Sequence, residues 1–145
     1  MKIYLAGSIA GGRDFEKGIK LISDVLEKMG HILMTKDNVV GNEFKKNPKR
    51  TLTDRRNVMK RDKKWIGECD AFIAEVSTYS HGVGYEHAYA ESLEKPILFL
   101  RSSKLNGVNY SAFLDGTEYK KFMFSFYDER NIDEILNKYF QKYFK

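Results

Sequence analysis

The chain has 145 residues, of which 42% are hydrophobic and 31% charged, and its formal net charge is +5. This balance is typical of one globular domain, which we expect over residues 1–145. No apolar run has membrane-spanning length, and the N-terminus reaches a glycine-rich turn too early for a signal peptide, so we expect a cytoplasmic protein with no membrane partner. The single cysteine, Cys69, excludes an internal disulfide framework and a cysteine-based zinc cluster.

The positive charge is concentrated in one basic segment. Residues 45–64 contain ten Lys or Arg against two Asp, and the rest of the chain is net acidic. A run of this kind is most often a solvated helix face. A second interpretation is an attractive field for an anionic small molecule. Nucleic-acid binding ranks third, because the segment lacks interleaved aromatic residues that would stack on bases, and we expect no nucleic-acid partner.

Strand-like and helix-like segments alternate along the whole chain. In chain order they are a strand over residues 2–6, a helix over 14–29, a strand over 31–35, a helix over 53–68, a strand over 71–77, a helix over 83–94, a strand over 97–100, a short helix near 111, a strand over 121–127 and a helix over 132–143. This order predicts a single-domain α/β fold of the flavodoxin or Rossmann-like type, with about five parallel strands and helices on both faces.

Two helix boundaries and one connection carry more specific expectations. Gly30 is expected to end the first helix, and Thr53 or Asp54 to cap the second. The connection over residues 36–52 is polar, contains a glycine and a proline, and is longer than most connections in compact domains. We therefore expect a mobile loop or lid there.

Two loops rich in glycine and serine follow predicted strands. Residues 6–13 read AGSIAGGR and residues 77–86 read STYSHGVGYE, and each leads into a predicted helix. In parallel sheets, ligands bind beyond the carboxyl ends of the strands, and backbone N–H groups at a helix start attract anions. Neither loop has the spacing of a dinucleotide or P-loop fingerprint. Together, the two loops predict a crevice that binds an anion, without indicating which anion.

Two carboxylates and a tyrosine are expected beside this crevice. Asp62 falls on the apolar stripe of its helix, where the structural alternative is an ion pair with Arg61 or a nearby lysine. We consider that pair the weaker interpretation, because those basic residues point to other faces. Glu86 falls near a helix start, where the helix dipole favours a negative charge without any further role. Tyr4 in the first strand is, by itself, a half-buried aromatic.

Four separated segments resemble a known family. They are YLAGSIAGGR, RDKKWIGECDAFIAEVS, SHGVGYE and NYSAFLDG, in this order. They closely resemble the Rcl-type 2′-deoxynucleoside 5′-monophosphate N-glycosidases of the nucleoside 2-deoxyribosyltransferase superfamily, and the resemblance covers nearly the whole chain. It implies a homodimer that hydrolyses the N-glycosidic bond of (deoxy)nucleoside 5′-monophosphates to free base and (deoxy)ribose 5-phosphate. It implies no cofactor and no metal, and the three histidines have no ligand-like spacing with acidic partners.

The resemblance also implies roles for individual residues. Glu86 would be the nucleophile that forms a covalent glycosyl-enzyme, Asp62 the general acid for the departing base, and Tyr4 the residue that orients Glu86. Water would then release the sugar. Substrate and phosphate binding are implied for a set of small residues, of which the last would come from the partner subunit: Gly7, Ser8, Ile9, Gly11, Ser80, Gly82 and Ser111.

Two positions bear on the preference for a phosphate. The resemblance aligns Ser80 with a position where the transferase branch carries an aspartate that holds the sugar 5′-hydroxyl. A carboxylate at this position would repel a phosphate dianion. Ala10 stands where the mammalian-type enzymes carry an arginine that contacts the phosphate. Retaining that contact would require Arg13 or a residue of the basic segment to take its place.

Two alternatives of other classes remain open from the sequence. The first is a transferase that passes deoxyribose to a second base, which would differ in whether free base outcompetes water. The second is a non-enzymatic nucleotide-binding module in which Asp62 and Glu86 are structural. The placement of two carboxylates and a tyrosine around one crevice disfavours the module.

Overall fold

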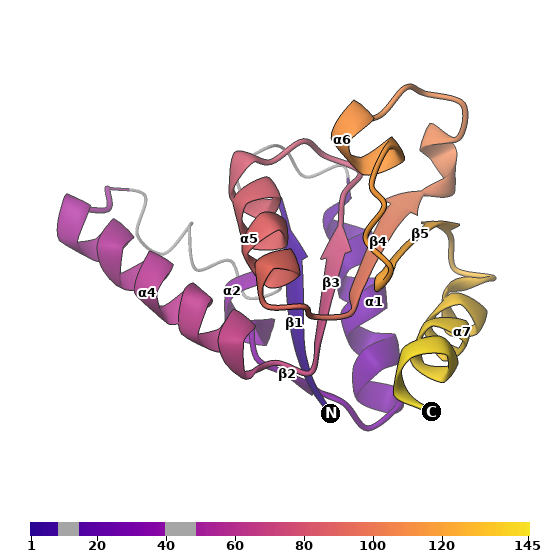
Figure 1. Ribbon diagram of the computed structural model, residues 1–145, viewed down its shortest axis with the longest axis horizontal. Coiled ribbons are helices and arrows are strands. Elements are labelled where there is room, and N and C mark those ends of the chain that lie inside the picture. Colours follow the sequence, from indigo (N-terminus) through magenta and orange to yellow (C-terminus); the bar gives the residue numbers. More distant parts are fainter. Residues whose placement is uncertain (9–14, 40–48) are drawn as a thin grey trace.

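A parallel sheet of five strands forms the centre of the protein, and helices cover both of its faces (Figure 1). The computed structural model describes residues 1–8, 15–39 and 49–145. The strands are β1 (Lys2–Gly7), β2 (Ile32–Leu33), β3 (Ala71–Glu75), β4 (Ile97–Ser102) and β5 (Phe122–Tyr127). Their order is β2-β1-β3-β4-β5, and every neighbouring pair is parallel. The predicted α/β class and parallel sheet are confirmed.

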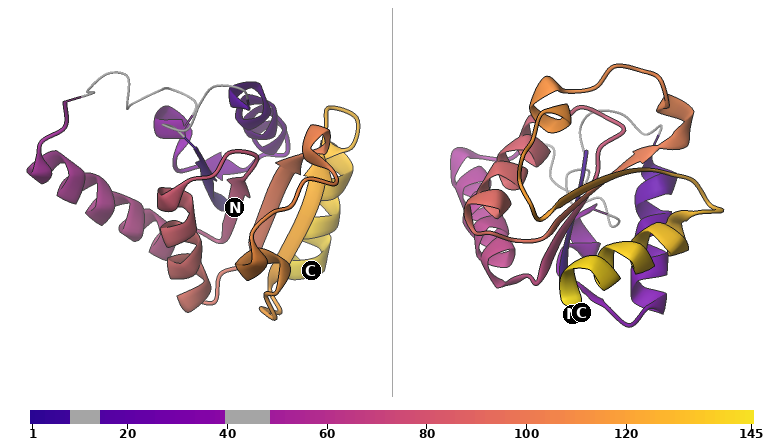
Figure 2. Two further views of the ribbon diagram at one scale, coloured as in Figure 1. Left: turned by 90° about the horizontal axis from the view of Figure 1, so that it is seen from above. Right: turned by 45° about the vertical axis from the view of Figure 1, so that its right-hand side comes forward.

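The helices form two layers around this sheet. They are α1 (Glu16–Lys28), α2 (Lys36–Val39), α4 (Leu52–Glu68), α5 (His81–Ser92), the 3₁₀ turn η1 (Ser103–Leu105), α6 (Ala112–Asp115) and α7 (Ile132–Phe144). Helices α4 and α5 lie on one face and α1 and α7 on the other, as two further views in Figure 2 also show. Short α6 lies beyond the carboxyl end of β4 (Figure 1).

Alternating side chains of the central strands build two cores. Ile3 and Leu5 of β1 pack with apolar residues of α1 and α7, whereas Tyr4 and Ala6 pack with residues of α4 and α5. All five residues of β3 are buried, which is expected of a parallel strand covered on both faces. The alternation therefore decides which side chains of β1 can reach the layer formed by α4 and α5.

The second strand is shorter than the sequence predicts, because a side chain replaces the backbone ladder. The Thr35 hydroxyl accepts a hydrogen bond from the Leu5 N–H at 3.1 Å and donates to the Leu5 carbonyl at 2.6 Å. Helix α2 follows directly, so the first part of the predicted loop 36–52 is helical. Residues 40–48 of that predicted loop lie outside the described residues.

One predicted helix end is confirmed and one predicted cap is wrong. Gly30 follows α1 with φ +84°, a left-handed conformation that glycine adopts easily. The N-cap of α4 is Thr51, whose hydroxyl accepts from the Asp54 N–H while the Asp54 carboxylate accepts from the Thr51 N–H. A capping box pairs the N-cap residue with the residue three positions later, here Thr51 with Asp54. Helix α4 therefore begins earlier than it would with a cap at Thr53 or Asp54.

A buried carboxylate ties three strands together at their carboxyl ends. Glu75 accepts hydrogen bonds from the Ser77 hydroxyl, from the Ser77 N–H at 3.2 Å and from the Tyr127 hydroxyl at 3.0 Å. The Ser77 oxygen in turn accepts from the Ser102 N–H at 2.8 Å. Burial raises the pKa of Glu75, and these hydrogen bonds oppose the shift. The turn at Ser77 ends β3 at Glu75, two residues before the predicted end.

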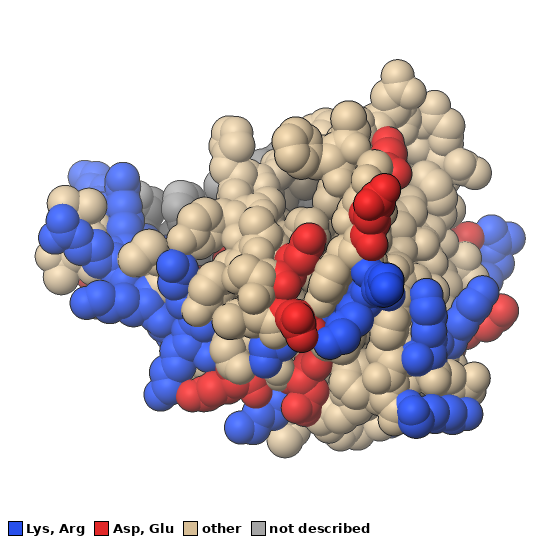
Figure 3. All heavy atoms as spheres, in the orientation of Figure 1, with Lys and Arg blue, Asp and Glu red and all other residues tan. Residues whose placement is uncertain are grey.

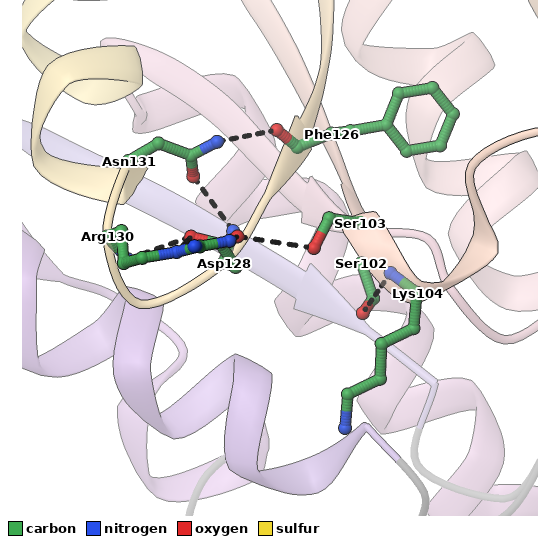
Figure 4. Close-up of polar contacts among 7 residues, drawn as sticks. All are labelled: Ser102, Ser103, Lys104, Phe126, Asp128, Arg130 and Asn131. Carbon is green, nitrogen blue, oxygen red and sulfur yellow. Dashed lines mark hydrogen bonds and ion pairs between the residues drawn. The ribbon is translucent and has the colours of Figure 1, made fainter.

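A second polar cluster joins the end of β5 to α7 (Figure 4). Asp128 accepts from the Arg130 guanidinium at 2.8 Å, and the Asp128 N–H donates to the Asn131 side chain at 2.8 Å. The Asn131 amide donates back to the Phe126 carbonyl at 3.3 Å. These contacts fix the turn from which α7 starts across the sheet.

Much of the basic segment forms an exposed surface of α4. Figure 3 shows Lys and Arg side chains distributed over the part of the molecule where Figure 1 places this helix. Arg55, Arg56, Lys60 and Lys64 are exposed there. Across the described residues, α4 and the other helices are all too short or too polar to cross a bilayer.

Gly18 of α1 leaves the space that the Tyr127 hydroxyl occupies, because a Cβ at this position would overlap that oxygen. We expect Gly18→Ala to lower the free energy of unfolding by about 1–3 kcal/mol through overpacking, although alanine favours helix more than glycine does. Denaturant unfolding measures the change. The matched control is Gly67→Ala in α4, where no described atom beyond the adjoining residues and the backbone of the same helix lies within 4 Å of the new Cβ.

The control should be neutral or slightly stabilising. Adding Tyr127→Phe to Gly18→Ala removes the overlapping hydroxyl and should recover part of the loss, at the expense of its bond to Glu75. Unchanged stability of Gly18→Ala would contradict this account of the packing.

Candidate active site

The site lies where the strand order reverses between β1 and β3. The chain runs from β1 outward to β2 on one side, and from β3 outward to β4 on the other. The loops after β1 and β3 therefore leave the sheet side by side, which is where ligands bind in open parallel sheets. Residues 9–14 of the first loop lie outside the described residues. Four positions singled out in the sequence fall there: Ile9, Ala10, Gly11 and Arg13.

Glu86 lies in the second turn of α5 rather than at its start. The helix begins at His81, two residues earlier than predicted, because the Ser80 hydroxyl caps it by accepting from the Val83 N–H at 3.3 Å. Glu86 is therefore beyond the first-turn N–H groups on which the helix-dipole interpretation depends. The helix dipole therefore does not explain why a carboxylate stands at position 86.

The explanation starts with Tyr4, which is hydrogen-bonded to the Glu86 carboxylate. Tyr4 is only 3% exposed, and its ring stacks on Phe72 with 5.4 Å between the centroids. Burial, followed by the negative charges of Glu86 and Asp62, raises the pKa of Tyr4 above its usual value. The phenol is therefore a neutral donor to Glu86 at physiological pH. The structure brings these two residues together although 82 positions separate them in the sequence.

The pKa of Glu86 is raised to about 7. Burial is the largest cause and Asp62 adds to it, whereas the Tyr4 hydrogen bond and the Arg61 charge oppose it. A carboxyl with such a pKa exchanges its proton near neutral pH. Perturbation of this kind, in a cleft and with specific partners, is typical of functional groups.

Asp62 and Glu86 line the same space from two helices. A cavity of about 60 Å³ is lined by both carboxylates together with Tyr4 and Gly7 at the carboxyl end of β1. A larger cavity of about 310 Å³ between α4 and α5 is also lined by both carboxylates, and Gly82 borders it. The two carboxylates, Tyr4, Gly7 and Gly82 thus surround one crevice on the α4 side of α5.

Asp62 has an ion-pair partner that the sequence analysis disfavoured. Both Nε and Nη2 of Arg61 lie 2.9 Å from Asp62 Oδ1. The Arg61 guanidinium lies over the Trp65 ring, 4.7 Å from its centroid. The Cα–Cβ bonds of Arg61 and Asp62 point to different faces of α4. The long Arg61 side chain nevertheless reaches Asp62, because it bends back while its guanidinium rests on the Trp65 ring one turn further along the helix. The expectation that the basic neighbours of Asp62 turn away from it is wrong.

The structure places two predicted phosphate contacts in a different cavity. Ser80 and Ser111 line a space of about 940 Å³ between α5, β4 and α6. Among the described residues, those lining this space include Gly84 and His87 of α5 but not Glu86. The N-terminal turns of α5 therefore stand between the Ser80 cavity and the crevice. Ser8, the remaining described member of the phosphate set, is half-buried directly after β1.

Sequence reasoning missed Arg101, which holds the segment before Ser111. Arg101 is 3% exposed, its Nη1 donates to the Val108 carbonyl at 3.0 Å, and its guanidinium lies 4.4 Å from the Tyr110 ring centroid. The cation thus fixes residues 108–110 against the end of β4. An arginine that closes an otherwise apolar strand, ILFLR, is the sequence signal that could have identified it.

Cys69 and the histidines offer no alternative centre in the parts of the chain that the structure describes. Cys69 is buried, and burial raises the pKa of its thiol to about 11, which is consistent with a packing role. In the same parts, no three His, Cys, Asp or Glu side chains lie together as a metal site would require.

Comparison with known proteins gives relatives along most of the chain. A Thermofilum pendens protein named as a 2′-deoxynucleoside 5′-phosphate N-hydrolase is 33% identical over 142 residues, which span 95% of this chain and 92% of that protein. The 5-hydroxymethyl-dUMP N-hydrolase of Mus musculus is 29% identical, over 97% of this chain and 80% of that protein.

Two solved structures share the fold. The CMP N-glycosidase of Clostridium botulinum has a TM-score of 0.62 at 22% identity and covers 94% of this chain and 99% of its own. A 2-deoxyribosyltransferase from Bacillus psychrosaccharolyticus has a TM-score of 0.66 at 20% identity, over 92% of this chain and 90% of its own. Residues 3–120 match the family model described as nucleoside 2-deoxyribosyltransferase, so the chain belongs to the nucleoside 2-deoxyribosyltransferase family.

Proposed function

We propose that the protein hydrolyses the N-glycosidic bond of (deoxy)nucleoside 5′-monophosphates, releasing free base and (deoxy)ribose 5-phosphate. The observation that carries the proposal is the half-buried Glu86 carboxyl, which is hydrogen-bonded to Tyr4 and shares a crevice with Asp62. The names of the relatives support the reaction class, since the Thermofilum pendens and Mus musculus proteins are both named as N-hydrolases of nucleotides.

Glu86 is the proposed nucleophile. Its carboxylate attacks C1′ of the sugar, the C1′–N bond breaks, and the bonding electron pair leaves with the base. Asp62 donates a proton to the departing base as general acid. Water then attacks C1′ and releases Glu86, while its proton returns to Asp62. Tyr4 orients the Glu86 carboxylate and, as a neutral donor, favours its ionised form.

The ion pair with Arg61 bears directly on the proposed role of Asp62. A guanidinium at 2.9 Å favours the ionised carboxylate, whereas a general acid must carry a proton when the base leaves. The alternative role for Asp62 is to accept a hydrogen bond from the base and orient it. Substrates with different leaving groups separate these two roles.

A base-exchanging transferase is the second candidate, favoured by the fold shared with the Bacillus psychrosaccharolyticus enzyme. It would use the same Glu86 intermediate and differ in the acceptor. A non-enzymatic nucleotide-binding module is the third. It would give no reason to hold half-buried Glu86 beside Tyr4 and Asp62, where the charged form of the carboxyl is disfavoured.

Glu86→Gln tests the reaction and its nucleophile together. The unmodified protein, incubated with the four common deoxynucleotides and their nucleosides, should release free base and deoxyribose 5-phosphate. Glu86→Gln should reduce this turnover by orders of magnitude, because an amide cannot form the ester. Glu68→Gln, the same change at the exposed end of α4, is the control. Near-normal turnover of Glu86→Gln would eliminate Glu86 as nucleophile, and faster transfer to added adenine than to water would favour the transferase.

The companion variant Asp62→Asn separates the two roles of Asp62. If Asp62 is the general acid, kcat should fall most for natural bases and least for an activated nitrophenyl glycoside, whose leaving group needs no proton. Equal losses on both substrates would argue against the acid role and for orientation of the base.

The preference for a phosphate is proposed to depend on Ser80. Its hydroxyl caps α5, whose free N–H groups and dipole attract an anion. Arg50 of the basic segment lines the crevice beside Gly7, and we propose that it compensates for the arginine replaced by Ala10. We therefore expect monophosphates to be hydrolysed faster than nucleosides.

Ser80→Asp tests this preference without removing the cap, because aspartate and asparagine cap helices as well as serine does. The new carboxylate should repel the phosphate and lower the ratio of kcat/KM for nucleotide over nucleoside by about ten- to a hundredfold. Ser80→Asn is the neutral control and should change the ratio little. Equal effects of both variants would show that size, not charge, governs the ratio.

We further propose a homodimer in which each subunit supplies Ser111 to its partner. Large apolar side chains are exposed around this residue, with Phe113 91%, Tyr79 70% and Val108 53% exposed. Such surface is suited to association with a second copy. The alternative is supply within one chain, since Ser111 of the same chain already lines the cavity of Ser80.

Complementation between inactive subunits distinguishes the two arrangements. Glu86→Gln and Ser111→Ala chains with different tags are co-purified as mixed dimers. Supply in trans creates one site with both native residues, so activity should return toward half that of the unmodified dimer. Supply within one chain leaves the mixed dimer no more active than its Ser111→Ala subunit. A strictly monomeric, fully active protein would contradict the proposal outright.

A further inference from the structure

We propose that Arg61 is a positioning residue of this site, which fixes the Asp62 carboxylate and supplies the positive charge that allows two carboxylates to share one crevice. The inference rests on the proposed role of Glu86 as nucleophile. It concerns a residue to which the sequence analysis gave no functional role.

The geometry of Arg61 is that of a held side chain, not a mobile surface cation. Two of its nitrogens contact the same Asp62 oxygen at 2.9 Å, and its guanidinium plane is supported by Trp65 at 4.7 Å. The side chains of Arg61 and Asp62 are 28% and 18% exposed. Exposed ion pairs contribute little because solvent screens them and both side chains must be ordered. Here the ring contact orders the arginine, and partial burial reduces the screening.

The charges around Glu86 show why a cation is needed there. The groups acting on it are Tyr4 of β1 and Asp62 and Arg61 of α4. Tyr4 is neutral, so Asp62 and Glu86 would place two negative charges in one partly buried space without Arg61. Like charges in such a space raise the proton affinity of one carboxyl, which would then be a poor nucleophile. Arg61 offsets one of the two charges.

Other cations are less well placed for this task. Arg50 lines the smaller cavity, and Arg55 and Lys63 line the larger one. The Lys63 ammonium is engaged with the tyrosines of α5, 5.4 Å from the Tyr85 ring and 4.8 Å from the Tyr89 ring. None of these three contributes to the pKa shift of Glu86, whereas Arg61 does.

Removal of Arg61 should therefore raise the pH at which Glu86 ionises. In Arg61→Gln the pKa of Glu86 should rise from about 7 by roughly half a unit to one unit. The acid limb of the pH profile of kcat/KM should move upward by the same amount, so activity lost at neutral pH returns at alkaline pH. Arg61→Lys keeps the charge but loses the planar fork, and should show a smaller shift.

The experiment titrates ¹³C-labelled glutamate carboxyls by NMR, with Glu86 identified by the signal that Glu86→Gln lacks. Lys60→Gln removes the same charge from the exposed side of α4 and is the matched control. An upward shift in Arg61→Gln, absent in Lys60→Gln and partly restored in Arg61→Lys, supports the proposal. Equal titration in all three variants overturns it. If Arg61→Gln does not fold, the pKa of Glu86 in Arg61→Lys is compared with that in Lys60→Gln. A higher value in Arg61→Lys supports the proposal, and equal values overturn it.

The NMR titration needs no turnover, so the two hypotheses can fail separately. A shift in a protein that releases no base leaves the effect of Arg61 on Glu86 intact and overturns the proposed hydrolysis. Release of base by the unmodified protein, with no shift and no displaced acid limb in Arg61→Gln, overturns the role of Arg61 alone.

Discussion

The register between β1 and β3 is the constraint on which the site depends. Tyr4 pairs with Phe72, so its side chain points into the layer of α4 and α5, stacks on Phe72 and reaches Glu86. A slip of one residue would turn Tyr4 toward α1 and α7 and place Leu5 against α5 instead. Ile3 and Leu5 fill one core and Tyr4 and Ala6 the other, so a slip would place side chains of the wrong size in both cores. The packing that specifies the fold thereby also fixes the partner of Glu86.

The same packing accounts for the unusual ionisation of Glu86. The Glu86 carboxyl is half-buried beside a strand residue and a neighbouring helix, so its surroundings must balance part of its charge. Burial and Asp62 favour the neutral form, and Tyr4 and Arg61 favour the ionised form. The pKa of Glu86 near 7 thus results from two contributions that raise it and two that lower it. It therefore responds to a change in any single neighbour, which a solvent-exposed glutamate would not do.

The sequence predicted those parts of the molecule that follow from periodicity and short-range chemistry. The alternation of strands and helices and the stop at Gly30 belong to this class. It could not predict where a side chain substitutes for a backbone partner, as the Thr35 hydroxyl does for Leu5 and the Glu75 carboxylate does for the Ser77 N–H. Arg61 was misjudged for a related reason: helical spacing describes the direction of the Cα–Cβ bond, but a long side chain resting on Trp65 ends elsewhere.

The separation of Ser80 from Glu86 gives α5 a second role under the proposed function. Ser80 caps the helix and Glu86 is its sixth residue, so about 9 Å of helix axis lies between them. A nucleotide would place its phosphate at the N-terminal end of α5 and its C1′ beside the second turn. Because one rigid element carries both contacts, a phosphate bound at Ser80 would help to set the approach of C1′ to Glu86. Binding energy from the phosphate would then contribute to the chemical step, not only to affinity.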